Sequence, residues 1–197
     1  MLHRKRLKRR LANLTPSIFT NNCIGGVIAH DLRLQFNAPT VNLLFDPCDD
    51  FITYLTHLSY YAQCEPEECR MPANSCPVGI LRGRGEIPDI QLHFLHYKTF
   101  AEAKAKWIER TARIHFDNIY VLMEVPQLSD ELLERFARLP YANKMIFAYE
   151  EHVKYPFVHT VRSLDKYVAG RIMDQNGLSG RRYLDEFDYV SFLNQGQ

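Results

Sequence analysis

Residues 17–26 read Ser-Ile-Phe-Thr-Asn-Asn-Cys-Ile-Gly-Gly, a short apolar run that ends in two amides, a thiol and a pair of glycines. A helical pattern follows over residues 27–34. In open α/β sheets, ligands sit outside the carboxyl ends of the strands, where a tight glycine turn brings backbone N–H groups and a helix N-terminus toward a polar group. The stretch therefore predicts a strand, a binding loop and a helix, in that order.

Strand and helix patterns alternate along the rest of the chain. Runs of apolar or alternating residues predict strands at 39–45, 89–96, 118–125, 144–148 and 157–163. Helical spacing, with a T-x-x-E capping box at Thr99 and a helix start at Ser129 and Asp130, predicts helices at 51–63, 100–114 and 129–138. The run 183–189 is expected to dock as a last helix. Asp49 or Asp50 is expected to cap the first of these helices. This alternation predicts an α/β fold with three layers, a mostly parallel sheet with helices on both faces.

The length and composition fit one main domain. A chain of 197 residues with 46% hydrophobic content can bury a full core. Residues 64–89 contain four prolines and three glycines among polar residues, which is typical of a long loop or insertion, with one strand expected at 78–81. We therefore expect a basic N-terminal arm at 1–14 and a single α/β domain at 15–197, with a loop-rich insertion at 64–89.

The charges are distributed unevenly. Residues 1–10 contain six of the 24 Lys and Arg and no acidic residue, whereas the rest of the chain carries 18 basic and 23 acidic residues. One interpretation places residues 1–14 on an anionic inner membrane surface, and the other treats them as a solvated helix or arm. The remainder has no basic stripe, so no nucleic-acid partner is expected.

The compartment is inferred from what the sequence lacks. No run approaches the roughly 18 to 20 apolar residues of a membrane span, and the basic start has no apolar region or cleavage site of a secretory signal. Five cysteines fit a reducing environment better than a disulfide framework. We expect a cytoplasmic protein, with peripheral contact with the inner membrane through residues 1–14 as the alternative.

Several motifs, taken in order, resemble the bacterial family called domain of unknown function 1919, over residues 8–194. They are Asn21-Asn22-Cys23 with Gly25-Gly26, Pro39-Thr40-Val41-Asn42-Leu43, His93-Phe94-Leu95-His96-Tyr97, Lys106-Trp107 with Arg110, and Leu139-Pro140 with Asn143-Lys144. Members of that family are often labelled exopolysaccharide biosynthesis proteins. The resemblance implies an α/β domain and a link to cell-surface polysaccharide, without an established catalytic mechanism. The chain departs from the family pattern at Ile24, where an aromatic residue is common, and at Ala38, where Ser is common.

Two residues are candidates for catalysis. Cys23 lies near a predicted helix N-terminus, where a thiol can become a nucleophilic thiolate, although a free cysteine also packs as a small apolar residue. His96 falls where a predicted strand ends, at the rim that would also hold Cys23, and could act as a general base. The alternative for His96 is an ordinary histidine that bonds to backbone groups at the strand end.

Six residues are candidates for ligand binding: Asn21, Asn22, Gly25, Gly26, Asn42 and Arg110. Side-chain amides bind polar ligands, but they also hold turns by bonding to the local backbone. Arg110 could bind a phosphate of a nucleotide-sugar through both guanidinium nitrogens, or it could pair with acids of its own chain.

No metal site is predicted. Cys64, Cys69 and Cys76 do not form the two close ligand pairs of structural zinc. The cluster of Asp46, Asp49 and Asp50 could hold a divalent cation against a diphosphate, but helix capping explains it as well. A divalent cation is therefore expected only as a companion of a nucleotide-sugar.

The function expected from these residues is that of an exopolysaccharide or capsule biosynthesis protein. The first hypothesis is a glycosyl or acyl group transferase that acts on a nucleotide-sugar or another carbohydrate-related small molecule. The alternative is a non-catalytic glycan-binding or interaction module of the same machinery. The chain contains no P-loop, no G-x-S-x-G elbow, no H-E-x-x-H and no G-x-G-x-x-G motif.

Overall fold

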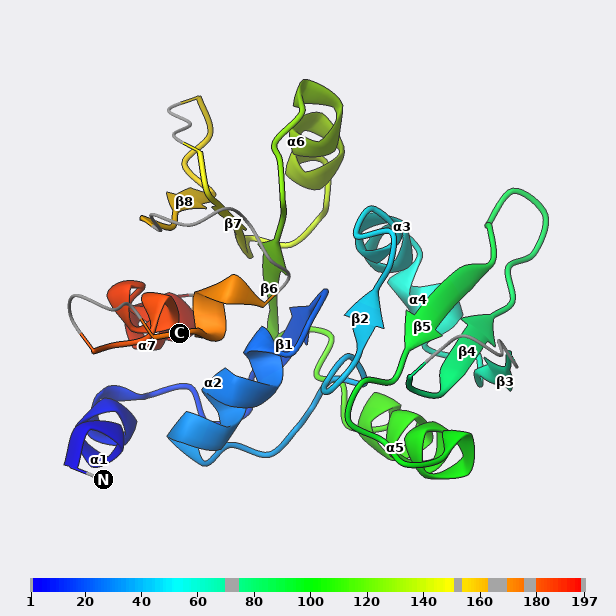
Figure 1. The fold of residues 1–197 in the computed structure, drawn as a ribbon, viewed down its shortest axis with the longest axis horizontal. Helices are drawn as coiled ribbons and strands as arrows, with labels where there is room; N and C mark the ends of the chain where they lie inside the picture. Colours follow the sequence, from blue (N-terminus) through cyan, green and yellow to red (C-terminus); the bar gives the residue numbers. More distant parts are fainter. Residues whose placement is uncertain (1, 70–74, 151–153, 163–169, 176–179, 196–197) are drawn as a thin grey trace.

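One sheet of the computed structural model is fully parallel, and it lies at the centre of the molecule (Figure 1). The structure describes residues 2–69, 75–150, 154–162, 170–175 and 180–195. The strands β1 (Ser17–Thr20), β6 (Ile119–Glu124), β7 (Asn143–Ala148) and β8 (Val158–Thr160) pair in that order. Thr20 pairs with Leu122, and Glu124 pairs with Phe147. The ends of β1, β6 and β7 therefore lie together at one edge of this sheet.

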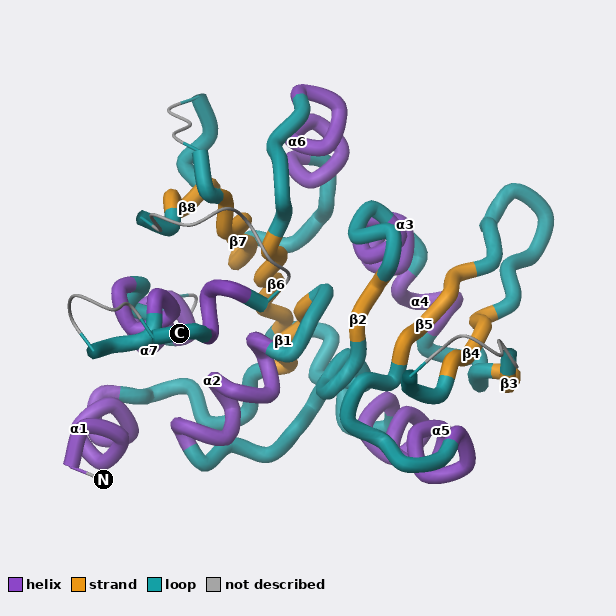
Figure 2. Tube along the Cα trace, in the orientation of Figure 1, coloured by secondary structure: helices purple, strands orange, loops and turns teal. Residues whose placement is uncertain are grey.

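A second sheet is antiparallel and lies beside the first (Figure 2), and residues of both sheets contribute to one core. Its order is β2 (Leu44–Phe45), β5 (Ile90–His93), β4 (Val78–Leu81) and β3 (Glu67–Glu68). The predicted α/β class is confirmed, and this sheet is an addition to it. Two strand predictions were too long, because only Leu44–Phe45 of 39–45 and only Ile90–His93 of 89–96 form strands.

Helices cover both faces of the parallel sheet, as predicted. Alternate residues of β6 point to opposite faces: Val121 and Met123 join one core, whereas Tyr120 and Leu122 join the other. The first core is covered by α3 (Asp50–Thr56), α4 (Leu58–Tyr61), α5 (Phe100–Thr111) and α6 (Asp130–Ala137). The second core is covered by α1 (Leu2–Arg10), α2 (Ile24–Leu32), η1 (Arg171–Met173), η2 (Tyr183–Glu186) and α7 (Tyr189–Leu193).

The N-terminal helix α1 packs against the C-terminal helix α7 (Figure 1). Leu7 and Leu11 are buried in the second core. Arg10 forms an ion pair with Asp188, and the Asn194 side chain accepts a hydrogen bond from the Ala12 N–H at 2.9 Å. The apolar side of α1 therefore packs against the protein. No helix in the described ranges is both long and apolar enough to cross a membrane.

The helix caps give a direct test of this fold. The Thr99 hydroxyl accepts a hydrogen bond from the Glu102 N–H at 3.2 Å, and the Ser129 hydroxyl accepts one from the Leu132 N–H at 3.1 Å. Thr99→Ala and Ser129→Ala should each lower the free energy of unfolding by about 1 kcal/mol, measured by urea denaturation. A change near zero in either variant would contradict the cap.

Asp49 is the matched control for these caps. It occupies the N-cap position of α3, but its side chain makes no cap hydrogen bond, so the capping prediction was wrong there. Its carboxylate instead pairs with Arg135 at 2.9 Å. Because that pair is partly exposed, Asp49→Ala should cost less stability than either cap variant.

Candidate functional site

Glu124 is the centre of a buried polar cluster at the carboxyl edge of the parallel sheet. It is the last residue of β6, and its side chain is fully buried. Its carboxyl group accepts hydrogen bonds from the Asn22 amide, from the Tyr149 hydroxyl at 2.6 Å, from the Gly170 N–H at 2.9 Å and from the Ile172 N–H at 3.1 Å. One side chain thus connects the end of β6 to the loops after β1 and β7 and to the start of η1.

The two predicted amides belong to this cluster. The Asn21 amide donates to the backbone carbonyl of Glu124 at 2.8 Å, and its oxygen accepts from the Glu124 N–H at 3.0 Å. The Asn22 oxygen accepts from the Ile24 N–H at 3.0 Å while its nitrogen binds the Glu124 carboxylate. Both residues are almost fully buried, and the hydrogen bonds of their side chains are made to groups of their own chain.

Burial dominates the acid–base behaviour of Glu124. Loss of hydration raises the pKa of its carboxyl group above the ordinary value, because the charged form is the one that needs water. The hydrogen bonds from Tyr149, Ile172, Gly170 and Asn22 lower the pKa and offset part of this effect. A buried carboxyl group with a raised pKa is a common component of reaction centres.

This raised pKa predicts a pH dependence of stability. Between the ordinary pKa of 4.5 and the raised pKa of the folded state, the folded protein binds more protons at Glu124 than the unfolded chain does. The contribution of this group to the free energy of unfolding is therefore complete below pH 4.5 and is lost as the pH rises through the raised pKa. Urea denaturation of the wild type and of Glu124→Gln at several pH values should show a difference that shrinks as the pH rises. A difference that grows with pH would contradict the raised pKa.

The N-terminus of α2 is occupied by side chains of the same loop. The Thr20 hydroxyl donates to the Asn22 carbonyl at 2.6 Å and accepts from the Gly25 N–H at 3.3 Å, while Asn22 accepts from Ile24. The sequence predicted that these N–H groups would face a ligand. In the structure, the N–H groups of Ile24 and Gly25 are bonded within the loop.

The two glycines allow close packing. A Cβ on Gly25 would lie 3.0 Å from the Thr20 hydroxyl oxygen, and a Cβ on Gly26 would lie 3.1 Å from Val41 and 3.4 Å from the Asn42 side-chain oxygen. The glycine pair therefore lets α2 approach β1 and the turn that contains Val41 and Asn42.

Cys23 occupies the N-cap position of α2 and is buried. Burial raises the pKa of its thiol to about 11. A cysteine nucleophile needs the thiolate form, which is a very small fraction of such a thiol at neutral pH. The position near a helix N-terminus was predicted correctly, but its surroundings favour the protonated thiol.

Alkylation tests this state of Cys23. At pH 7.5, iodoacetamide should leave Cys23 unmodified in the folded protein and modify it in urea, and the native rate should rise with pH because the thiolate fraction grows. Peptide mass spectrometry resolves Cys23 from the partly exposed Cys64 and Cys69. Rapid native alkylation of Cys23 at neutral pH would contradict the raised pKa.

His96 and Arg110 differ from what the sequence predicted. His96 lies in an exposed turn after β5, and β5 belongs to the antiparallel sheet, not to the parallel sheet whose edge holds Cys23. The His96 side chain makes no hydrogen bond to any described residue. Arg110 is buried and donates to the Val41 carbonyl at 3.1 Å and to the Tyr97 hydroxyl at 2.6 Å. Its guanidinium group also lies 5.1 Å from the centre of the Phe36 ring. Arg110 therefore holds three segments of its own chain together.

Asn42 lies close to the predicted loop, with a positive φ of 67° and its side-chain oxygen near Gly26. The structure thus brings Asn21, Asn22, Cys23 and the glycine pair together, with Asn42 beside them. Across the described residues, no group of three or more His, Cys, Asp or Glu is placed to hold a metal ion.

Glu124 was not predicted from the sequence. The signal was a single acidic residue in the apolar run Ile-Tyr-Val-Leu-Met-Glu-Val at 119–125. A charged residue at the end of a buried strand needs partners, and those partners come from segments about 100 residues earlier and 46 residues later. Only the fold shows that these segments meet.

Comparisons with known proteins agree with the motifs. The family described as a domain of unknown function (DUF1919) matches residues 2–194. A protein of Haemophilus influenzae that is described as uncharacterized is 33% identical over 190 residues, which cover 95% of this chain and 88% of that protein. The predicted resemblance is therefore confirmed, and the chain belongs to the DUF1919 family.

Proposed function

We propose that the chain is a glycosyl-group transferase of exopolysaccharide or capsule assembly, with its reaction centre at Glu124. The observation that carries the proposal is a fully buried carboxyl group with a raised pKa, held by Asn22 and Tyr149 at the carboxyl edge of the parallel sheet. Ligands of open α/β sheets bind at this edge, and the resemblance in the sequence supplies the link to polysaccharide. Acyl transfer through Cys23 is the weaker version, because burial keeps that thiol protonated.

In this reaction Glu124 acts as the general base. An acceptor hydroxyl oxygen forms a bond to C1 of the donor sugar, the bond from C1 to the phosphate oxygen breaks, and the hydroxyl proton passes to the Glu124 carboxylate. The nucleoside diphosphate leaves with the bonding electrons, accompanied by any divalent cation that it carries. Glu124 is fully buried, and the N–H groups of Gly170 and Ile172 cover its carboxylate, so this step requires those groups to move away from the carboxylate.

The test is the release of nucleoside diphosphate from a panel of nucleotide-sugars, with saccharide acceptors and with Mg²⁺ or Mn²⁺. Glu124→Gln should lower the rate by roughly 100-fold or more, and the wild-type rate should rise with pH through the raised pKa. Glu109→Gln, which alters an exposed carboxylate on α5, is the control. Turnover that survives Glu124→Gln in a folded protein, or the absence of turnover with every donor, would refute the proposal.

A second candidate function is a non-catalytic module at the cytoplasmic face of the inner membrane. It is favoured by α1, where Arg6, Lys8 and Arg9 are exposed while Leu7, and Leu11 just after the helix, are buried in the core. The helix thus presents charge to an anionic surface while its apolar side stays inside the protein.

Sedimentation with anionic liposomes tests this candidate. Replacing Arg6, Lys8 and Arg9 with Gln should weaken binding by about 1 kcal/mol for each residue, and added salt should weaken the binding of the wild type. Substitution is preferable to truncation, because deleting α1 would expose the second core. Lys98→Gln, on an exposed turn, should have no effect. Equal sedimentation of the triple variant would exclude a membrane role for α1.

A further inference from the structure

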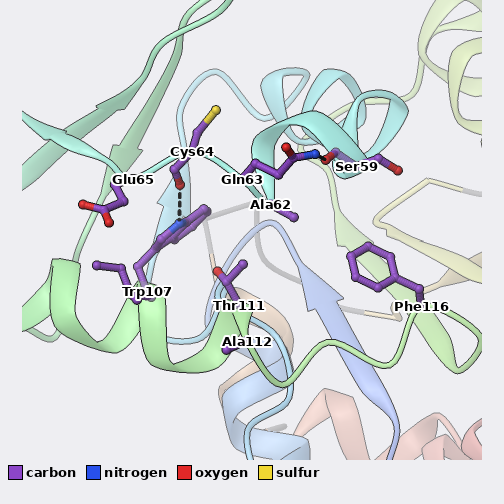
Figure 3. A pocket seen from close by; sticks show the side chains of 10 residues that line it. Ser59, Ala62, Gln63, Cys64, Glu65, Trp107, Thr111, Ala112 and Phe116 are labelled. Carbon is purple, nitrogen blue, oxygen red and sulfur yellow. Dashed lines mark hydrogen bonds between the residues drawn. The ribbon is translucent and has the colours of Figure 1, made fainter.

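Two pockets among the helices of the first core differ in charge. The pocket between α4 and α5 has a volume of about 640 Å³, and Trp107 and Phe116 lie on opposite sides of it (Figure 3). No basic residue lines it, so it offers no counter-charge to an anion. The pocket between α3 and α6 has a volume of about 330 Å³, and it is lined by Arg135 and Arg138 without any acidic residue. This second pocket therefore carries the charge that an anionic ligand requires.

His57 adds an uncommitted donor to the pocket between α3 and α6. It follows the end of α3, and its ring lies 6.4 Å from the ring of Tyr61. Neither ring nitrogen has a hydrogen-bond partner in the part of the chain that the structure describes, and neither is fully buried. An imidazole carries at least one N–H group in every protonation state. His57 can therefore donate a hydrogen bond to a ligand in the pocket.

Arg135 is partly used by its own chain and is held in place by that use. One terminal nitrogen donates to the Asp49 carboxylate at 2.9 Å, and the other donates to the Thr53 hydroxyl at 3.1 Å. The Nε–H group has no hydrogen-bond partner among the described residues, and Nε is not fully buried. Arg135 thus offers a donor whose orientation is fixed before a ligand arrives.

Arg138 is the most accessible of the three groups. It donates to the Glu134 carboxylate at 3.3 Å, and the two side chains are 78% and 56% exposed. An exposed ion pair of this kind contributes little to stability, so Arg138 can turn toward a ligand at small cost. The Thr56 hydroxyl already donates to the Ile52 carbonyl at 2.8 Å. The donors for a ligand are therefore the two arginines and the histidine.

A phosphate ester is the anion that suits this set of donors. A carboxylate brings a single charge, which Glu134 already supplies to Arg138. A phosphate group brings a charge of about −1.5 to −2 at pH 7 and three acceptor oxygens, so it can bind several donors at once and displace Glu134. The lining also contains Ile52, Leu139 and Pro140, which suit the carbon part of an ester. The volume lies at the lower end of the range of roughly 300 to 1,000 Å³ that is typical of small-molecule sites.

We propose that the pocket between α3 and α6 binds a small organic phosphate, with His57, Arg135 and Arg138 as donors to the phosphate oxygens. The helix α6 begins after the loop that follows Glu124, and its eight residues span roughly 12 Å. Arg138 follows the other end of that helix. The phosphate site is thus separate from the proposed reaction centre and does not depend on the proposed function.

Isothermal titration calorimetry of the full chain tests the proposal. The titrants are glucose 6-phosphate and glycerol 3-phosphate, and the comparisons are glucose, gluconate and inorganic phosphate. At least one of the two esters should bind in a saturable way. Glucose, which lacks the anion, and gluconate, which replaces the phosphate with a carboxylate, should both bind at least 10-fold more weakly.

Variants then locate the site. Arg138→Gln should raise the dissociation constant of the ester by about 10-fold or more, because hydrogen bonds from a charged donor are lost. His57→Phe, which keeps a ring and removes its nitrogens, should raise it by about 3- to 10-fold. Arg113→Gln is the matched control, because Arg113 forms an i,i+4 ion pair with Glu109 on α5 just as Arg138 does with Glu134 on α6. This control should leave the dissociation constant unchanged, and urea denaturation verifies that all three variants are folded.

Three results would overturn the proposal: no binding by either ester, ester binding that neither Arg138→Gln nor His57→Phe weakens, or gluconate binding as tight as that of the esters. Inorganic phosphate that binds as tightly as the esters would overturn the assignment to an organic phosphate. The release of nucleoside diphosphate in the transferase test has no bearing on these results, so the two proposals succeed or fail separately.

Discussion

Glu124→Ala should lower the free energy of unfolding by at least about 4 kcal/mol, because two buried and two partly buried donors would lose their acceptor at roughly 1 to 3 kcal/mol each. Those donors are the Asn22 amide, the Tyr149 hydroxyl and the N–H groups of Gly170 and Ile172. Urea denaturation, followed by Trp107 fluorescence and by circular dichroism, measures the change. If the variant is too unstable to purify, Glu124→Gln keeps the shape of the side chain and should show a smaller loss.

The control for this prediction is Glu109→Ala on α5. Glu109 forms ion pairs with Lys106 and Arg113, but all three side chains are at least partly exposed to solvent, so the variant should remain close to the wild type. The comparison separates the loss of a carboxylate from the loss of a buried acceptor. Equal stability of the two alanine variants would mean that Glu124 does not hold the three loops together.

The parts of the fold that were predicted well have strong local signals. The strand β6 and the helices α5 and α6 were predicted within a few residues, because a continuous buried run and a capping hydroxyl mark their ends. The segment 39–45 was predicted less well. Val41 and Leu43 are buried, but Val41 lies in a turn and Leu43 between that turn and β2, and burial alone does not distinguish a strand from a packed turn. The antiparallel pairing of the second sheet depends on partners far along the chain, which local patterns do not specify.

The same distinction applies to the site. Asn21 and Asn22 were correctly placed after the end of a strand, because that signal lies within ten residues. Gly25 and Gly26, which were expected in a turn before the helix, lie in the first turn of α2. The role of Arg110 was not predictable in this way. The side of α5 that faces Val41 and Tyr97 is known only once the two sheets are placed, and this packing turns a candidate phosphate ligand into a buried connection. The Glu124 cluster likewise depends on segments that meet only in the folded chain.

Trp107→Ala should lower the free energy of unfolding by about 3 to 5 kcal/mol, the usual cost of removing a large buried aromatic side chain. Trp107 is fixed on both sides, with its ring 6.0 Å from that of Tyr54 and its N–H bonded to the Cys64 carbonyl. Circular dichroism during urea denaturation measures the loss, since the variant has no tryptophan. Phe116 lines the same pocket as Trp107 but is 56% exposed. The variant Phe116→Ala should therefore stay within about 0.5 kcal/mol of the wild type in its free energy of unfolding. The contrast between the two variants distinguishes the buried side of the pocket, which stabilises the fold, from its exposed side. A loss below about 1 kcal/mol for Trp107→Ala would mean that α5 does not pack on the first core as described.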